Sequence, residues 1–158
     1  MNNGNFKLAM NFIAQWEWGN RKDGGYTNDP VDPGGETKFG IAKKSYPDID
    51  IKSLTLSEAE AIYYHEYWLS ANCESMEWPL AMSVFDASVN CGVGRAKAWV
   101  AKSVGEENDA RRNATLFNQE RIAYYKGLVE KRPSLNKYIK GWLNRVNDLS
   151  KYIDVASK

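Results

Sequence analysis

The stretch that decides the fold class of this chain is Asn28-Asp29-Pro30-Val31-Asp32-Pro33-Gly34-Gly35-Glu36-Thr37-Lys38-Phe39-Gly40-Ile41. Its fourteen residues include three carboxylates, three glycines and two prolines, which predict turns rather than long regular structure. Tyr26-Thr27 before it and Thr37-Lys38-Phe39 within it predict a short β-hairpin. Carboxylates beside a rigid turn, with aromatic residues close by, are the groups that cleavage of a glycosidic bond needs.

Apolar residues outside this stretch predict a mainly α-helical chain. Phe6, Met10 and Ile13 recur at helical spacing, and Gly19-Asn20 ends that pattern after Trp18. A length of 158 residues suits one compact domain with a buried core. Further helices are expected after a cap at Thr55 or Ser57 and over residues 79–90, 95–104, 109–131 and 134–152.

The charge pattern excludes several classes of partner. The formal net charge is +1, and the basic residues are scattered among acidic ones, so we expect no nucleic-acid-binding face. No apolar run approaches the roughly 18 residues of a membrane-spanning helix, so we expect no stable membrane insertion. Residues 1–7 lack the pattern of a signal peptide, which predicts synthesis in the cytoplasm of a bacterial host.

Cysteine and histidine are too rare for common metal chemistry. The chain has Cys73, Cys91 and a single histidine, His65, without a CxxC or HExxH motif. We therefore expect no zinc site, no other metal and no cofactor. A cysteine peptidase built on Cys91 and His65 stays formally open, although neither residue lies in a peptidase-like motif. Two free thiols are the simpler interpretation.

Glu17 is the first candidate for acid chemistry. It lies at the edge of the apolar stripe, in the last turn of the predicted helix. Partial burial and the negative end of the helix dipole both favour the protonated carboxyl, which is the form that a general acid needs. The alternative is a surface carboxylate paired with Arg21 or Lys22.

The turn supplies the other candidates. Asp29 precedes a proline, as structural Asx turns often do. Asp32 and Glu36 bracket the glycines of the turn, where a substrate can approach the backbone closely. Thr37 follows with a hydroxyl group that could hold a water molecule.

The run from Gly24-Gly25-Tyr26 to Asp32-Pro33-Gly34-Gly35-Glu36-Thr37-Lys38-Phe39-Gly40-Ile41 resembles glycoside hydrolase family 108, the N-acetylmuramidases of phage endolysins and bacterial secretion-activator proteins. Residues 141–146, Gly-Trp-Leu-Asn-Arg-Val, are similar to the end of the small predicted peptidoglycan-binding region that usually follows. The resemblance covers nearly the whole chain. Further similar motifs are, in order, Tyr46-Pro47-Asp48, Leu54-Thr55, Ile62-Tyr63, Tyr67-Trp68, and Phe85-Asp86 with Val89-Asn90 and Gly92.

This resemblance implies a mainly α, lysozyme-like helical domain with a small β-hairpin after the first helix. It also implies hydrolysis of the β-1,4 bond between N-acetylmuramic acid and N-acetylglucosamine, without a cofactor. Residues 1–158 would form one compact domain. Residues 6–92 would be the glycoside hydrolase lobe with the catalytic loop, and residues 95–158 a C-terminal helical lobe that resembles a peptidoglycan-binding region.

The chain departs from the family pattern at the catalytic glutamate. Typical members have a Glu directly before Gly-Gly-Tyr, where this chain has Asp23. Either residues 18–23 are an insertion after a catalytic Glu17, or Asp23 is a shortened replacement. Glu17 is favoured because it ends an apolar helix, as the family's glutamate does, and because Asp lacks a methylene for the same reach.

These arguments lead to seven candidate site residues. Glu17 is predicted to protonate the glycosidic oxygen. Asp32 or Glu36 is predicted to activate the water or stabilise the developing positive charge, and Thr37 to orient that water. Aromatic rings that flank the turn and a polar side chain at the end of the central helix are predicted to contact substrate. These three residues are Tyr26, Phe39 and Asn90.

Two other functions stay open. A lytic transglycosylase cuts the same bond with a single Glu. A non-catalytic peptidoglycan-binding or phage structural relative is favoured by the displaced acid before Gly24. For the preferred function we expect a monomer that binds glycan strands of bacterial peptidoglycan. Since the wall lies outside the membrane, we expect a phage or prophage lysin that a holin-like pore releases to the cell wall in the periplasm.

Overall fold

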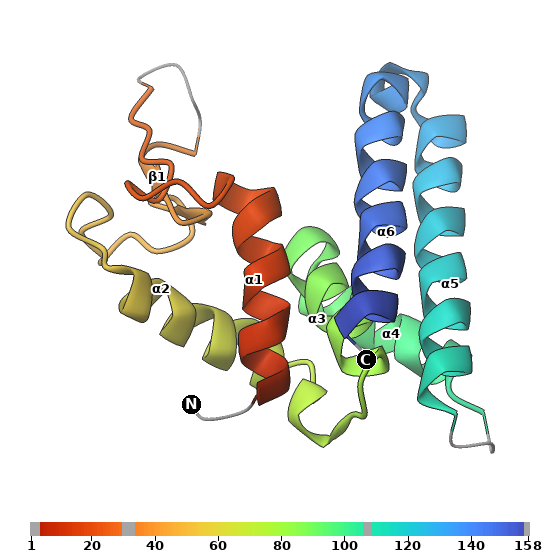
Figure 1. Ribbon diagram of the computed structural model, residues 1–158. Coiled ribbons are helices and arrows are strands. Elements are labelled where there is room, and N and C mark those ends of the chain that lie inside the picture. The colour runs from red at the N-terminus through yellow and green to blue at the C-terminus, as the bar shows by residue number, and fades with distance from the viewer. Residues whose placement is uncertain (1–3, 30–33, 106–108, 157–158) are drawn as a thin grey trace.

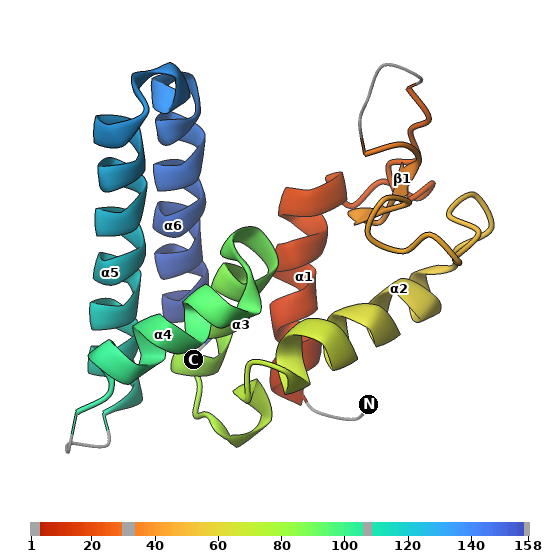
Figure 2. The same ribbon diagram turned by 180° about the vertical axis from the view of Figure 1, so that it is seen from behind.

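Figure 1 shows the computed structural model, which describes residues 4–29, 34–105 and 109–156. These described residues form six α-helices and one two-stranded sheet. Helix α1 lies between an arm formed by α2 and a tall antiparallel pair formed by α5 and α6, and Figure 2 shows the same order from behind. The helices are α1 (Gly4–Trp18), α2 (Leu56–Ile62), α3 (Leu80–Cys91), α4 (Val93–Ser103), α5 (Ala110–Lys131) and α6 (Asn136–Ala156).

The sheet is the next regular element after α1 in the chain, and it begins at Thr37. Thr27 forms an isolated antiparallel bridge with Thr37, as the sequence predicted. Strand β1 (Thr37–Lys38) then pairs with β2 (Ile41–Ala42), a strand that the sequence analysis missed. The two residues between them, Phe39 and Gly40, have φ angles of 51° and 74°. Positive φ at both positions is typical of a tight type I′ hairpin, so Phe39 belongs to the turn rather than to a strand.

Helix α3 is the centre of the core. Nine of its twelve residues are buried, and it contacts α1, α4 and α5. The ring of Phe85 on α3 packs against Phe6 of α1 and Trp68 of the π-helical segment η1 (Tyr63–Leu69). One buried cluster therefore connects the hairpin side of the molecule with the α5–α6 pair.

Several predicted helix boundaries are confirmed. Thr55 caps α2, with a reciprocal hydrogen bond between the cap and Glu58. Asp109 caps α5 by accepting hydrogen bonds from two backbone N–H groups. The predicted fold class, a mainly α, lysozyme-like domain with a small hairpin, is confirmed. Among the residues that the structure describes, no helix has both the length and the apolar character needed to span a membrane.

Candidate active site

Glu17 lies where the end of α1 meets the hairpin turn. A Cβ atom placed on Gly40 would lie 3.1 Å from the Cβ of Glu17 and would collide with the hydroxyl of Tyr63. Gly40 also has a positive φ of 74°, which disfavours any other residue. The turn therefore passes directly over Glu17, whose side chain keeps 23% of its surface exposed to solvent.

Tyr63 fixes the turn on the side of Glu17. Its hydroxyl donates a hydrogen bond of 3.0 Å to the carbonyl oxygen of Phe39. Burial, followed by the negative charge of Glu17, raises the pKa of Tyr63 well above its ordinary value. Tyr63 therefore keeps its proton and remains a donor. Sequence analysis assigned no site role to this residue.

The ionic partner of Glu17 is Arg145 from α6. Nη1 of Arg145 donates a 2.7 Å hydrogen bond to Oε1 of Glu17. The alternative of a surface pair with Arg21 or Lys22 is thereby replaced, since Arg21 pairs with Asp23. The carboxyl of Glu17 therefore faces a buried guanidinium rather than the purely apolar helix edge that the sequence predicts.

Arg145 belongs to a buried network centred on Asp86 of α3. Its Nε and Nη2 atoms donate hydrogen bonds of 3.0 and 2.8 Å to Oδ1 of Asp86, and Nη1 of Arg121 donates one of 2.6 Å to Oδ2. Burial acts to raise the pKa of Asp86, but Arg145 and Arg121 outweigh it and lower that pKa below its ordinary value. Burial likewise disfavours the charge on Arg145, but Asp86 and Glu17 raise its pKa. The charged forms of Asp86, Arg121 and Arg145 are therefore favoured.

Asn90 also takes part in this network. Its Oδ1 atom accepts hydrogen bonds from the hydroxyl of Tyr125 and, at 3.2 Å, from Nη2 of Arg121. These contacts connect the end of α3 with α5. They account for the polar side chain at this position without a substrate, and the predicted contact with substrate stays a prediction.

Asp23, the rival acid, lies in an exposed turn. Its carboxylate accepts a 3.0 Å hydrogen bond from the backbone N–H of Gly25 and a 2.8 Å one from Arg21. The bond from Gly25 and then that from Arg21 lower the pKa of Asp23. Asp23 is therefore an exposed carboxylate held within its own turn, whereas Glu17 is only 23% exposed.

The carboxylates of the loop are described only in part. Asp32 lies outside the described residues. Glu36 is half-buried and accepts a 2.7 Å hydrogen bond from the hydroxyl of Tyr26, which raises the pKa of Tyr26. Thr37 follows in β1 and exchanges backbone hydrogen bonds of 2.9 Å with Thr27. The structure thus brings Tyr26, Glu36 and Thr37 together on one side of the hairpin.

Phe39 requires a correction. The sequence analysis expected its ring to contact a sugar, but the ring is only 6% exposed. It packs edge-on against Trp18 with ring centroids 5.5 Å apart, and a Cβ on Gly24 would lie 2.5 Å from it. Phe39 is therefore a core residue that seals the hairpin onto α1, and it explains why Gly24 has no side chain.

The cysteine and histidine side chains lie in three different elements, none of which carries Glu17. Burial raises the pKa of Cys73 to about 12, so its thiol keeps the proton and is no nucleophile. Cys91 lies beside the hydroxyl of Tyr125 at 3.2 Å, and His65 is exposed on η1. Within the described ranges, no group of three or more His, Cys, Asp or Glu side chains could hold a metal ion.

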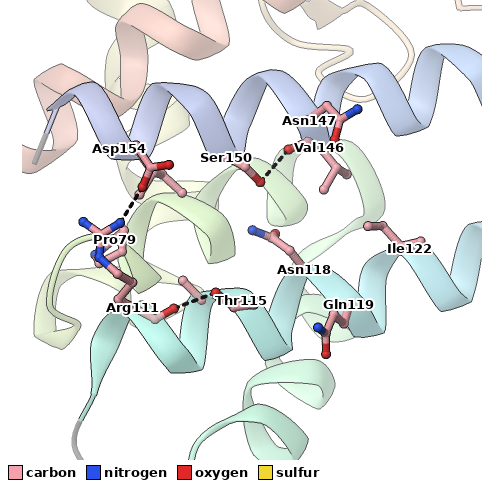
Figure 3. A pocket seen from close by; sticks show the side chains of 12 residues that line it. Pro79, Arg111, Thr115, Asn118, Gln119, Ile122, Val146, Asn147, Ser150 and Asp154 are labelled. Carbon is pink, nitrogen blue, oxygen red and sulfur yellow. Dashed lines mark hydrogen bonds and ion pairs between the residues drawn. The ribbon is translucent and has the colours of Figure 1, made fainter.

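Glu17 lines neither of two pockets in the described structure. One of about 760 Å³ runs between α1 and α2, with Met10, Trp18 and Leu56 among its lining residues. Figure 3 shows the other, of about 230 Å³, between α5 and α6 beside Asn118 and Ser150. Neither is lined by a candidate acid.

Two comparisons with known proteins found a match. Residues 12–92 match the family model described as Glycosyl hydrolase 108. A solved structure, "Structure of Brucella abortus SagA", is 23% identical and covers 96% of this chain and 95% of that chain, with a TM-score of 0.74. At this identity the similarity concerns the fold. No curated protein matches the chain. The family match ends before α4, so it does not include the predicted C-terminal binding region.

Proposed function

Because the chain belongs to the glycosyl hydrolase 108 family, we propose that it hydrolyses the β-1,4 bond between N-acetylmuramic acid and N-acetylglucosamine in bacterial peptidoglycan. The observation that carries the proposal is the position of Glu17, which lies under the hairpin turn, is partly exposed and has a cationic partner. A positioned carboxyl beside a glycine-rich turn is the arrangement that glycosidic cleavage requires.

In this mechanism Glu17 acts as the general acid. It gives its proton to the glycosidic oxygen as the bond breaks, and it becomes a carboxylate in the same step. Arg145 then stabilises the negative charge from 2.7 Å. A bound glycan would exclude water from Glu17, and this desolvation favours the protonated form that the step needs.

The second group would come from the hairpin side. Glu36 or Asp32 would activate the water or stabilise the developing positive charge, with Thr37 orienting that water. Support comes from Glu36, which is half-buried and fixed by Tyr26 at 2.7 Å, next to Thr37. The distance between the two carboxyl groups in the complex with glycan would decide between inversion and retention.

One observation favours a lytic transglycosylase as a second candidate. The carboxylate of Glu36 already accepts a hydrogen bond from Tyr26, whereas Glu17 lies against the turn without a second described carboxylate in contact with it. A transglycosylase needs a single Glu and releases an anhydro sugar instead of a reducing end. The two reactions are therefore distinguished by their products.

Digestion of purified peptidoglycan by the wild type, Glu17→Gln and Asp23→Asn tests the proposal, with products identified by mass spectrometry. We expect reducing muropeptides from the wild type and from Asp23→Asn. Glu17→Gln removes the proton donor and should lower kcat by about 10²- to 10⁴-fold. Anhydro products would identify a transglycosylase. Full turnover by Glu17→Gln would remove Glu17 as the acid, and an inactive wild type would indicate a binding or structural relative.

A further inference from the structure

A continuous chain of charged contacts ends on Glu17. It connects four side chains from four helices: Glu17 of α1, Arg145 of α6, Asp86 of α3 and Arg121 of α5. We propose that Arg145 is a positioning residue for Glu17, that Asp86 and Arg121 fix Arg145, and that the C-terminal helix pair is therefore part of the catalytic unit. This inference rests on the proposed function, since it concerns the same acid.

Hydrogen bonds to Asp86 fix the orientation of the Arg145 guanidinium group. Two of its nitrogen atoms donate to the same oxygen of Asp86, at 3.0 and 2.8 Å, and this pair of bonds fixes the plane of the guanidinium. The third nitrogen, Nη1, is thereby directed at Glu17. The ring of Trp16 lies 5.7 Å from the guanidinium carbon, and the side chain of Arg145 is only 8% exposed.

Asp86 is itself fixed from the opposite side. It is fully buried, and its second oxygen accepts a 2.6 Å hydrogen bond from Arg121. Arg121 is held in turn by the hydroxyl of Tyr125 at 2.9 Å and by Asn90. The position of the acid at the end of α1 thus depends on side chains of α3, α5 and α6.

The charges of this chain affect the acid directly. Two guanidinium groups balance two carboxylates, so that protonating Glu17 leaves one uncompensated positive charge. The groups that face Glu17 are Arg145 from α6, the neutral hydroxyl of Tyr63 from η1 and the backbone of Gly40 from the hairpin. From the 2.7 Å contact we therefore expect Arg145→Gln to keep the Glu17 proton to higher pH than the wild type does.

This assignment gives α6 a role other than wall binding. The family match covers residues 12–92, whereas Arg145 lies 128 residues after Glu17, in the predicted C-terminal lobe. That lobe supplies a contact to the acid. Separating residues 95–158 from the rest would therefore remove the support of Glu17 as well as any binding surface.

Activity measurements on Arg145→Gln and Arg145→Lys test the proposal, with Arg111→Gln as the matched control. Arg111 forms an exposed ion pair with Asp154 on the same helix pair. Because Gln neither fixes nor stabilises the acid, we expect kcat of Arg145→Gln to fall about 10- to 100-fold with little change in KM. The alkaline limb of its pH profile should move to higher pH.

The lysine variant separates charge from geometry. Lys keeps the positive charge but lacks the planar fork, so kcat should fall while the alkaline limb stays close to that of the wild type. Arg111→Gln should match the wild type in both measurements. Wild-type kcat and pH profile in a folded Arg145→Gln, or wild-type kcat in Arg145→Lys, would overturn the proposal.

A titration without substrate separates this inference from the proposed function. The Glu17 carboxyl is followed by NMR in ¹³C-glutamate-labelled protein, in the wild type and in both Arg145 variants. A midpoint that moves to higher pH in Arg145→Gln but not in Arg145→Lys supports the contact even if peptidoglycan proves not to be the substrate. Equal midpoints in the wild type and Arg145→Gln overturn it even if the wild type is active.

Discussion

The hairpin loop and the buried charge network both contact Glu17, but they are built differently. Contacts of the loop are local in the chain, as with Tyr26 and Glu36, which are 10 residues apart. Contacts of the network join residues 35, 59 and 128 positions apart, on four helices. The loop therefore covers Glu17 with a locally encoded turn, whereas the network contacts Glu17 only once all four helices have packed.

Solvent exposure separates the two regions as well. The Arg21–Asp23 pair of the loop has side chains that are 58% and 56% exposed, whereas Arg121 and Asp86 are completely buried. Water screens the first pair, so its effect on stability is small. In the second pair, loss of one partner leaves a buried charge without compensation. The comparison implies that substitutions in the network affect stability and activity together.

The largest effect is expected for Asp86→Asn. This change leaves the guanidinium groups of Arg121 and Arg145 buried without their shared carboxylate. We expect the free energy of unfolding to fall by about 3–5 kcal/mol, measured by urea denaturation. Asp23→Asn is the matched control in the loop and should leave it unchanged. Equal effects of the two substitutions would show that the network contributes no more than a surface pair.

A smaller effect is expected for Gly40→Ala in the hairpin turn. A positive φ costs a residue other than glycine about 1–2 kcal/mol, and the new methyl group would also displace Glu17 or Tyr63. Digestion assays should therefore show activity reduced about 10- to 100-fold.

Gly19→Ala is the control for Gly40→Ala. Gly19 has a similar φ of 62°, but no described atom lies within 4 Å of the position of its Cβ. It should lose stability to a comparable extent while keeping activity. If Gly19→Ala lost as much activity as Gly40→Ala, backbone strain rather than contact with Glu17 would be the cause.

The smallest effect on stability is expected when the pH is lowered. The pKa of Asp86 in the folded protein lies below its ordinary value of 3.8, because Arg145 and Arg121 outweigh burial. Its contribution to stability is therefore complete above pH 3.8 and is lost as the pH falls through the lower, folded-state pKa. Unfolding free energies measured downward from neutral pH should decline more steeply in this range for the wild type than for Asp86→Asn. Parallel curves would contradict the lowered pKa.

Much of the fold could be predicted because its signals are local. Apolar spacing and the stop at Gly19-Asn20 located α1, and Thr55 was one of two expected caps of α2. Strand β2 escaped notice because two residues are too short for a periodic pattern. Phe39 was assigned to substrate because an aromatic residue in a turn looks exposed, and only the packing of Trp18 against it shows otherwise.

The network could be anticipated only in part. Asp86 stands inside an apolar run of α3, and a charged residue in a buried helix requires a partner. That signal was present in the sequence, but nothing local identifies Arg121 or Arg145 as the partners. From the sequence, Arg145 is expected only to pack the last helix against the core, and Tyr63 is only part of a motif in the middle of the chain.

The sequence by itself determined the helices, the glycine-rich turn, the family and the choice of Glu17 as candidate acid, since each depends on neighbouring residues or a contiguous motif. Only the tertiary structure decided which cation faces Glu17, which aromatic ring is buried and why Gly40 lacks a side chain. The physical reason is that an ion pair or a close contact depends on distance in space. For Glu17 and Arg145 that distance is 2.7 Å across 128 residues of chain.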